Sequence, residues 1–535
     1  MASSRQIQKT RDSASTFRTM VTAVNKKYNV VLLTIDALRY DHCGFNGYPR
    51  DISPGMNKIA EHAVVFDNMY STGPCTPPAF CSLFTATFPF DKGGYSPLPI
   101  RKSTIAEAFK KYGYQTAGFT SNPQNSHYFN YNRGFVKFYD SLISSSKNPL
   151  ARRVLAYFEK SGEKSNALYN RLQSIKLPKT VQASLMHLFY RVLLGRSFIY
   201  YLPARGITRW ARKWLYYHYF QDMQNREPFF LWIHYMDTHG PFRPKWKNLV
   251  KINPHFPRSA FDYIKRYPEY NDVLKENNRK KTLVDLYDAG IRAIDERIGF
   301  FVRGLKRKHA YEKTIFFLLA DHGEEFNDHG DYGHRAHLYN ELLHVPFMIF
   351  GGPIERGEYP ALRPGTRVTS LHSLVQVAPT ILQMVGIPEP SSFEANGILD
   401  AMDNSESHSP GNEEQSLVSA IGEHVMACTY HKGIVTRFNQ SNDRSIKQAI
   451  SLQTKSVKYI FDTETMKQEL YDLQEDPLEK QDIASEHDDA LRLFHDVSMN
   501  YLKGNGFLFS PKRQLETDGE KEKLLSALQR IKARL

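Results

Sequence analysis

A carboxylate stands beside an imidazole at the end of one apolar run. Residues 314–320 are almost wholly apolar or aromatic, and Asp321, His322 and Gly323 follow directly. Both side chains can bind a divalent cation, and a glycine lets the backbone approach it closely. A surface turn would also explain these three residues. The density of imidazoles just downstream favours a metal or substrate site. Those imidazoles belong to His329, His334 and His337.

A second carboxylate ends another apolar run. Asp36 closes residues 29–36, whose other members are mostly β-branched or aliphatic. An ionised aspartate that is buried there needs a partner, because an unpaired buried charge is costly. A metal ion would provide that partner, and capping of the following helix is the alternative.

A hydroxyl is predicted at the start of a helix within residues 73–85. Thr76 and Pro77 fit the N-cap and first helical position, where amide hydrogens and the helix dipole favour an anion. A phosphate or sulfate ester bound there would contact the hydroxyl, although capping alone also explains Thr76. Cys75 is the rival nucleophile, but no neighbouring residue argues for a lowered thiol pKa.

A third polar cluster closes the run at residues 229–236. His239 can donate to an oxyanion or act as a general acid, and Asp237 can orient it. A loop histidine that bonds to the backbone is the alternative for His239.

The elements that would position these residues are strands buried on both faces. Four apolar runs predict them, and helical patterns lie between the runs at residues 101–112 and 280–306. Such alternation predicts an α/β fold, in which ligands bind beyond the carboxyl ends of the strands. Three of those ends carry the polar clusters, so we expect one site. The runs are residues 29–36, 229–236, 314–320 and 345–350.

Taken in chain order, these motifs resemble the sulfatase family of the alkaline phosphatase superfamily. The resemblance runs from about Asn29 to Asp482 and includes residues 371–388, Lys458 to Ile460 and Glu469 to Pro477. It implies an α/β fold with a mostly parallel central sheet flanked by helices, and a smaller C-terminal β-containing subdomain.

The resemblance also implies roles for single residues. Asp36, Asp321 and His322 would bind a divalent metal ion such as Ca, Mg or Mn. Thr76 would be the nucleophile, in a register set by the match at residues 82–85. His239 matches a histidine that contacts the ester, and His334 falls where related enzymes carry a lysine that contacts the transferred group. Three further residues are expected to line the substrate pocket: Asn122, Asp237 and His337.

The sequence departs from the family pattern in two places. Members that make formylglycine carry C-x-P-x-R, whereas residues 75–79 end in Ala79, and counting from Thr76 the arginine position holds Phe80. We therefore expect no formylglycine. Ala37 stands where many members have a second aspartate ligand.

The resemblance implies a metal-dependent hydrolase of sulfate esters that acts on a glycan or another anionic substrate. Two alternatives stay open. One is a phosphodiesterase or a phosphoglycerol- or phosphoethanolamine-type transferase of the same superfamily. The other is a member that binds glycans without turnover, which the two departures would also fit.

Composition limits the protein class and its partners. The 535 residues are 41% hydrophobic and carry a net charge of +14, which fits a globular protein with an anionic partner. Residues 151–220 hold thirteen Lys or Arg against two Glu. This basic, aromatic-rich insert suggests peripheral contact with an anionic membrane, and solvated surface charge is the alternative. Nucleic acid is not an expected partner. Four cysteines in this spacing predict no disulfide framework.

The sequence also predicts how the chain is divided. A polar N-terminal extension (1–28) precedes a catalytic domain (29–400), in which residues 151–220 are a helical insert. A mobile linker (401–416), a C-terminal subdomain (417–485) and a charged helical tail (486–535) follow. Without an apolar leader or an 18-residue apolar run, we expect a cytoplasmic location, with membrane association through the insert.

Overall fold

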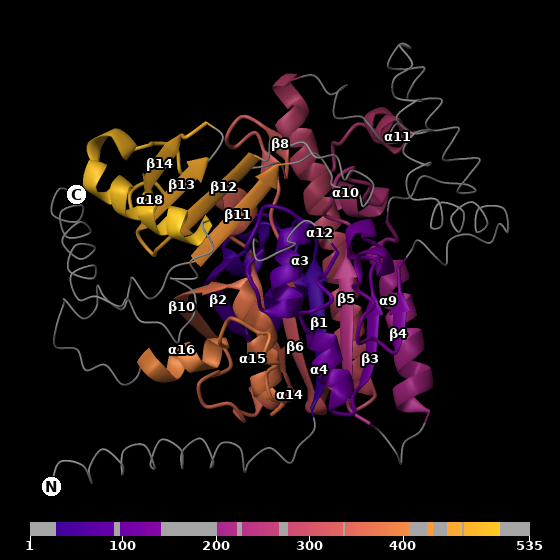
Figure 1. Ribbon diagram of the computed structural model, residues 1–535. Helices are drawn as coiled ribbons and strands as arrows, with labels where there is room; N and C mark the ends of the chain where they lie inside the picture. The colour runs from indigo at the N-terminus through magenta and orange to yellow at the C-terminus, as the bar shows by residue number, and fades with distance from the viewer. Residues whose placement is uncertain are drawn as a thin grey trace, which may run out of the picture.

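The structure is a computed structural model that describes residues 28–89, 97–140, 201–221, 227–266, 276–334, 337–405, 425–431, 447–462 and 465–502. Its central feature is an eight-stranded sheet in the order β10-β2-β9-β6-β1-β5-β3-β4 (Figure 1). All strand pairs are parallel except those that β9 makes with β2 and β6. The predicted mostly parallel α/β sheet is confirmed. The strands are β1 (Asn29–Ile35), β2 (Val64–Tyr70), β3 (Gln115–Phe119), β4 (Lys137–Tyr139), β5 (Phe229–Tyr235), β6 (Thr314–Ala320), β9 (Phe347–Gly351) and β10 (Thr366–Ser373).

The three middle strands, β1, β5 and β6, are buried along their whole length. Their aliphatic and aromatic side chains pack on both faces of the sheet, as expected of a parallel sheet covered by helices. The pairing register sets Ile35 opposite both Tyr235 and Ala320. The residues that follow these strands therefore emerge at the same edge of the sheet.

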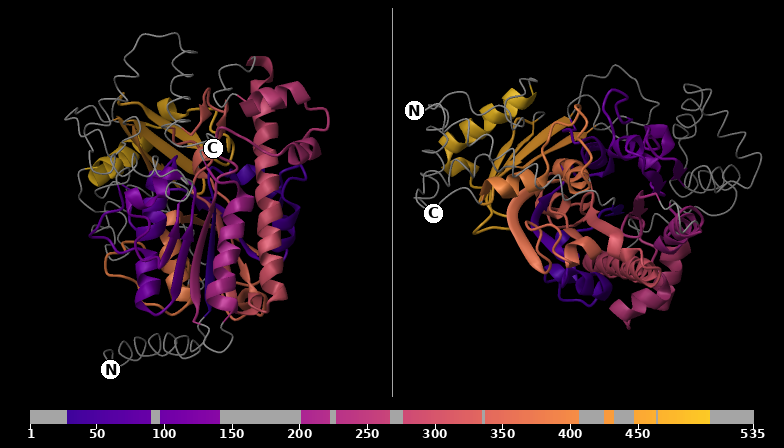
Figure 2. Two further views of the ribbon diagram at one scale, coloured as in Figure 1. Left: turned by 90° about the vertical axis from the view of Figure 1, so that its right-hand side faces the viewer. Right: turned by 90° about the horizontal axis from the view of Figure 1, so that it is seen from below.

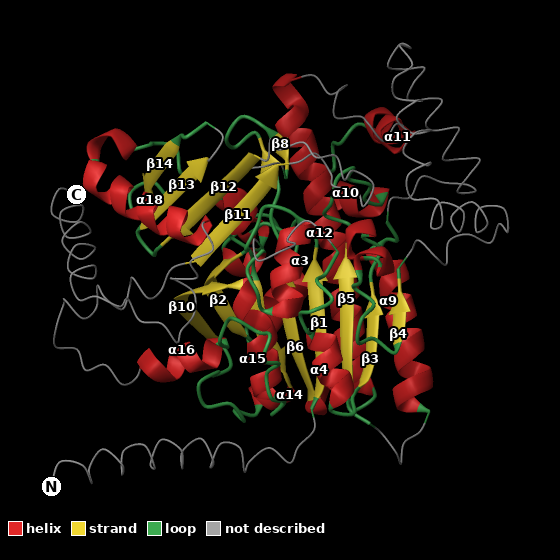
Figure 3. Cartoon of the chain, viewed as in Figure 1, coloured by secondary structure: helices red, strands yellow, loops and turns green. Residues whose placement is uncertain are grey.

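Helices cover both faces of this sheet (Figures 2 and 3). The long α12 runs along one face beside α9, and α3, α4 and α15 lie against the other (Figure 2, left). The helices are α2 (Pro54–Ala60), α3 (Thr76–Thr85), α4 (Ile105–Lys111), α9 (Ala204–Leu215), α10 (Trp246–Ile252), α11 (Arg258–Arg266), α12 (Glu276–Arg307), α13 (Asn340–Leu343), α14 (Gly352–Glu355), α15 (Val377–Met384), α16 (Ile398–Ser405) and α18 (Asp488–Leu502).

A smaller antiparallel sheet follows in the C-terminal part, in the order β11-β12-β13-β14. Helix α18 packs on it through a cluster that includes Tyr459, Leu470 and Phe494. A further apolar cluster joins this sheet to the central body, with Ile460 and Tyr471 against Leu338 and Leu371. The predicted C-terminal β-containing subdomain is confirmed. Its strands are β11 (Val425–His431), β12 (Lys447–Gln453), β13 (Val457–Asp462) and β14 (Gln468–Asp472).

Several predicted segments lie outside the described residues. These are nearly all of the N-terminal extension, residues 151–200 of the basic insert, residues 406–416 of the linker and the tail beyond residue 502. The described end of the insert holds α9, where Trp210, Tyr216 and Tyr217 are exposed near Arg209 and Lys213. Membrane contact through this face stays a prediction. No helix among the described residues has both the length and the apolarity to cross a bilayer.

Candidate active site

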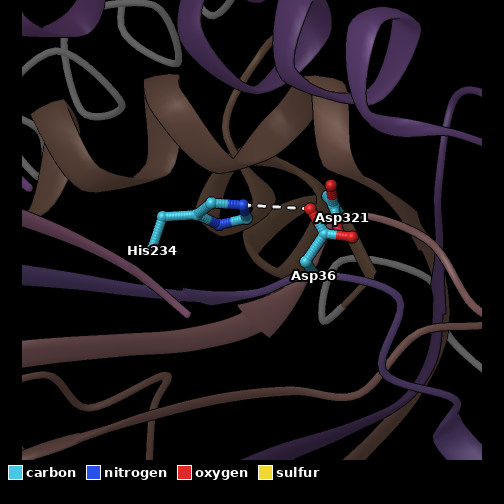
Figure 4. A group of neighbouring side chains, drawn as sticks. All are labelled: Asp36, His234 and Asp321. Atoms are coloured by element: carbon cyan, nitrogen blue, oxygen red, sulfur yellow. Dashed lines mark hydrogen bonds and ion pairs between the residues drawn. The ribbon is translucent and has the colours of Figure 1, made fainter. Parts of the chain in front are cut away.

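Two buried carboxylates meet where β1 and β6 end. Asp36 and Asp321 each follow one of these paired strands, and neither is exposed to solvent. The amide of Ala37 donates to Asp321 Oδ1 at 3.2 Å, which ties the two strand ends together. Figure 4 shows the two carboxylates side by side, with His234 reaching Asp36 from β5.

One oxygen of each carboxylate accepts no hydrogen bond from any described residue: Asp36 Oδ1 and Asp321 Oδ2. His322 Nε2 lies 3.7 Å from the first and 3.6 Å from the second. The other ring nitrogen of His322, Nδ1, donates a hydrogen bond to the carbonyl of Gly323 at 2.8 Å, so Nε2 keeps its lone pair. Two carboxylate oxygens and one imidazole nitrogen thus converge, and this donor set suits a divalent cation.

Electrostatics at these groups supports the same conclusion. Burial, and after it the charge of Asp36, raise the pKa of Asp321 well above its ordinary value. Burial lowers the pKa of His322 to about 3, so its ring is neutral and can act as a ligand. Burial also opposes ionisation of Asp36, but nearby histidines, His239 first, outweigh it and lower the pKa of this carboxyl. A cation would relieve the repulsion between the two carboxylates.

Thr76 lies against these ligands at the first residue of α3. Its Oγ1 is 3.4 Å from Asp36 Oδ2 and 3.4 Å from His322 Nε2, and the residue is 1% exposed. The N-cap of α3 is Cys75, one residue earlier than expected. Cys75 has extended backbone geometry, so Thr76 is the first helical residue, and its hydroxyl contacts Asp36 and His322. Pro77 and Pro78 also lack amide hydrogens, so the first turn offers few backbone donors to an anion.

Asn122 holds the threonine hydroxyl and the first carboxylate together. Its amide nitrogen donates to Asp36 Oδ2 at 2.7 Å and to Thr76 Oγ1 at 3.1 Å. The side-chain carbonyl of Asn122 accepts from the amide of Gln124, which fixes which end of the side chain faces the site. Asn122 thus lies beside Thr76 and Asp36, and its role toward a substrate stays a prediction.

His234 is a site residue that the sequence reasoning did not select. Its Nε2 lies 3.1 Å from Asp36 Oδ2, and its Nδ1 lies 2.8 Å from Thr34 Oγ1. With Asp36 and Asp321 it forms a buried group whose ligand atoms all lie within 4.8 Å of one another. The signal was present, because Thr34 pairs with His234 in the parallel register and both are polar residues inside apolar strands. His234 was not predicted because it lies within β5, whereas the predicted site residues follow the ends of strands.

Two more histidines flank the ligands. The ring of His334 lies 4.7 Å from that of His322 and 4.8 Å from that of His239, centroid to centroid. Although burial opposes protonation of His334, its contact with Glu324 at 2.9 Å outweighs burial and raises its pKa. His334 can therefore carry positive charge beside the site. His239 Nδ1 donates to the carbonyl of Gly240, which leaves its Nε2 unprotonated when the ring is neutral.

The remaining two candidates have other contacts. The carboxylate of Asp237 accepts from the amide of Ala204 at 2.7 Å and so anchors the first turn of α9. The sequence had predicted instead that Asp237 orients His239. His337 Nε2 is 3.9 Å from Asp331, and its ring faces Tyr339 at 6.0 Å. The structure does not bring either residue into the group around Asp36 and Asp321.

Known proteins with related sequences are sulfatases. Arylsulfatase K of Rattus norvegicus is 25% identical over 45% of this chain, and the match spans only 38% of that protein. The ulvan-active sulfatase of Formosa agariphila is 23% identical over 74% of this chain and 68% of its own length. The choline-sulfatase of Rhizobium meliloti is 22% identical over 68% of each chain.

Solved structures share the fold. One was determined in complex with its substrate D-glucosamine-2-N,6-O-disulfate; it covers 91% of this chain and 100% of its own, with 16% identity and a TM-score of 0.62. A phosphonate monoester hydrolase from Silicibacter pomeroyi covers 91% and 97%, with 18% identity and a TM-score of 0.59. The model of the sulfatase family matches residues 28–387, and the chain therefore belongs to the sulfatase family.

Proposed function

We propose that this protein hydrolyses sulfate esters with the help of a divalent cation, and that Thr76 is its nucleophile. One observation carries the proposal. The buried hydroxyl of Thr76 lies 3.4 Å from both Asp36 and His322, at the point where two carboxylate oxygens have no hydrogen-bond partner among the described residues. Cys75, the other candidate nucleophile, is less buried and precedes the helix.

The cation would be held by Asp36, Asp321 and His322. When bound there, it would lower the pKa of a neighbouring hydroxyl and offset negative charge on the ester. His234 Nε2 lies 3.1 Å from Asp36 Oδ2 and holds that carboxylate in place. Asn122 donates to Thr76 Oγ1, which directs the hydroxyl hydrogen toward the carboxylate and imidazole acceptors.

The chemistry then proceeds in two displacements. Thr76 Oγ1 passes its proton to Asp36 Oδ2, which lies 3.4 Å away, and attacks the sulfur in line, so a bond from sulfur to the threonine oxygen forms and the bond to the leaving oxygen breaks. His334 or His239 protonates that leaving oxygen. Water then attacks the sulfur of the sulfated threonine and gives a proton to the histidine that protonated the leaving oxygen. The bond from sulfur to Thr76 Oγ1 breaks, sulfate is released, and the threonine oxygen takes its proton back from Asp36. Positive charge on His334 stabilises the nonbridging oxygens as the threonine attacks.

A sulfated sugar is the substrate class that we propose. Support comes from the relatives: one is named for activity on ulvan, and one solved structure holds a glucosamine disulfate as its substrate. The net charge of +14 favours anionic ligands in general. Phosphoester transfer stays the alternative, because a threonine hydroxyl can attack phosphorus by the same in-line route.

The test is turnover of matched aryl sulfate, aryl phosphate and phosphodiester substrates by protein loaded with Ca, Mg or Mn. We expect sulfate ester hydrolysis that a chelator abolishes. Thr76→Ala should lower kcat by at least about 10³-fold, whereas the matched control Cys75→Ala should keep most activity. Turnover of phosphoesters alone would favour the phosphotransfer alternative, and turnover of none would favour a binding protein.

A further inference from the structure

Glu479 of the C-terminal part has a strained backbone conformation, and its carboxylate and its carbonyl both accept hydrogen bonds. It ends the Asp476-Pro-Leu-Glu479 stretch between β14 and α18, is 1% exposed and has a φ of 58°. Few residues other than glycine adopt this left-handed conformation, so surrounding contacts must hold it. Its carboxylate Oε1 accepts from Lys458 Nζ at 2.7 Å, and neither side chain is exposed.

Glu479 also binds both ends of the loop that carries His334. We define the His334 loop as residues 329–334 and 337–340. At its start, His329 Nε2 donates to the carbonyl of Glu479 at 2.9 Å. At its end, the amide of Asn340 donates to Glu479 Oε2 at 2.8 Å, and Lys458 Nζ donates to Asn340 Oδ1 at 2.9 Å. One residue of the C-terminal subdomain thus closes the base of a loop of the catalytic body.

The group formed by His329, Glu341 and Glu479 resembles a metal site in composition. Its bonding argues otherwise. His329 Nδ1 lies 2.6 Å from Glu341 Oε1, and its Nε2 faces the carbonyl of Glu479, so both ring nitrogens meet acceptors and both donate. A ring with two donors has no lone pair for a metal. The ring of Tyr339 stacks on His329 at 3.6 Å. We call the contacts of Glu479 with His329, Asn340 and Lys458, together with this stacking, the clasp.

The clasp bears on chemistry through His334. The first half of the loop is also fixed from within the catalytic body, where Glu325 Oε1 accepts from the amides of His329 and Asp331, each at 2.9 Å. His334 itself bonds to Glu324 and lies beside His322 and His239. Because the second end of the loop is tied to Glu479 and Lys458, the position of His334 depends on the subdomain.

We propose that Glu479, paired with Lys458, is a positioning residue: it clasps the base of the His334 loop and so sets His334 beside the reacting group. The inference rests on the proposed function, since it assigns the purpose of the clasp to that reaction. A buried ion pair that only fastened the subdomain to the body would stabilise the fold without affecting the chemical step.

The test compares Glu479→Gln with a control, Phe494→Leu. The control weakens packing of α18 on the C-terminal sheet, where Phe494 stacks against Tyr459, and does not touch the loop. We expect Glu479→Gln to lower kcat about tenfold or more with little change in KM, and to speed amide hydrogen exchange in residues 337–340, which the carboxylate holds, but not in β6. Phe494→Leu should lower the Tm while leaving kcat and loop exchange near wild type.

A double-mutant cycle separates positioning from general destabilisation. If Glu479 acts through His334, Glu479→Gln should cost little further kcat once His334→Ala is present. An equal loss in both backgrounds, or loop exchange equal to wild type, would overturn the proposal.

A milder variant covers the case in which Glu479→Gln does not fold. Asn340 is the first residue of α13, where proline is well tolerated, and Asn340→Pro removes its amide donor to Glu479 together with the acceptor for Lys458. It should speed loop exchange in the same way. If the wild type turns over no ester, the exchange measurements still decide whether the clasp exists, and only its catalytic purpose falls with the proposed function.

Discussion

At the residue scale, the carboxylates of Asp36 and Asp321 are the strongest evidence for a bound cation. Both are fully buried, both follow adjacent strands, and each has an oxygen without a hydrogen-bond donor among the described residues. Burial of two like charges is costly unless an opposite charge is present. His322 adds a nitrogen whose lone pair faces the same space.

Metal binding should therefore stabilise the fold. At a cation concentration of about 100 times Kd, we expect the wild type to gain about 2.7 kcal/mol of unfolding free energy. Asp321→Asn should abolish most of that gain and, without metal, should be at least as stable as the wild type because it removes a carboxyl whose ionisation is opposed by burial and by Asp36. Calorimetric Tm values with and without Mn²⁺ check both points. A gain in Asp321→Asn equal to that of the wild type would contradict this ligand assignment.

Most of this site could be predicted from the sequence. The apolar runs that end in Asp36 and in Asp321 with His322 pointed to side chains that the structure brings together, and motif order selected Thr76 and Asn122, which lie beside Asp36. Their roles as ligands and nucleophile stay predictions. His234 was missed because it lies within β5, where its neighbours suggested core packing. Asp237 and His337 were grouped with the site by nearness in sequence, but backbone geometry after the strands directs them elsewhere.

At the scale of elements, the parallel pairing of β1 with β5 and β6 brings the site residues together. Asp237, which follows β5, links this end of the sheet to helix α9. Asp237 follows β5 by two residues and anchors the start of α9 through the amide of Ala204. Burial raises the pKa of Asp237 to about 7. The contact is therefore sensitive to pH within the physiological range.

The sign of this effect follows from proton binding. Between about pH 4 and pH 7 the folded state holds a proton on Asp237 that the unfolded state has lost, so the contribution of this group to stability is fully present below about pH 4 and is lost as pH rises to about 7. We expect Asp237→Asn, which keeps an oxygen acceptor for Ala204, to remove this loss. The difference in urea midpoint between the two proteins should increase from pH 4.5 to pH 7.5 in favour of the variant, and a constant difference would refute the assignment.

The elements themselves show where sequence reasoning ends. The run at residues 314–320 matches β6 residue for residue, because a buried strand requires an unbroken apolar sequence. The run at residues 345–350 became β9, shifted to Phe347–Gly351 and antiparallel to both neighbours. Strand direction depends on the path of the connecting segments, which the hydrophobic pattern does not encode.

At the scale of the whole molecule, the C-terminal sheet packs against the catalytic body and contacts the loop that carries His334. The ribbon of the C-terminal sheet lies beside that of the central body (Figure 1). Apolar contacts and the hydrogen bonds of Glu479 join the two parts. The sequence predicted the subdomain from its similarity to known sulfatases, but its contact with the His334 loop required the fold. Cytoplasmic location and membrane contact through the basic insert stay predictions.

The central claim is that Thr76 carries the sulfo group during turnover. The most direct measurement is rapid quenching of metal-loaded protein with an aryl sulfate, followed by peptide mass spectrometry across residues 73–85. The account predicts one added sulfo group, located on Thr76, that is absent from Thr76→Ala and retained in Cys75→Ala. A sulfo group on Cys75, or undiminished sulfate ester turnover by Thr76→Ala, would contradict it.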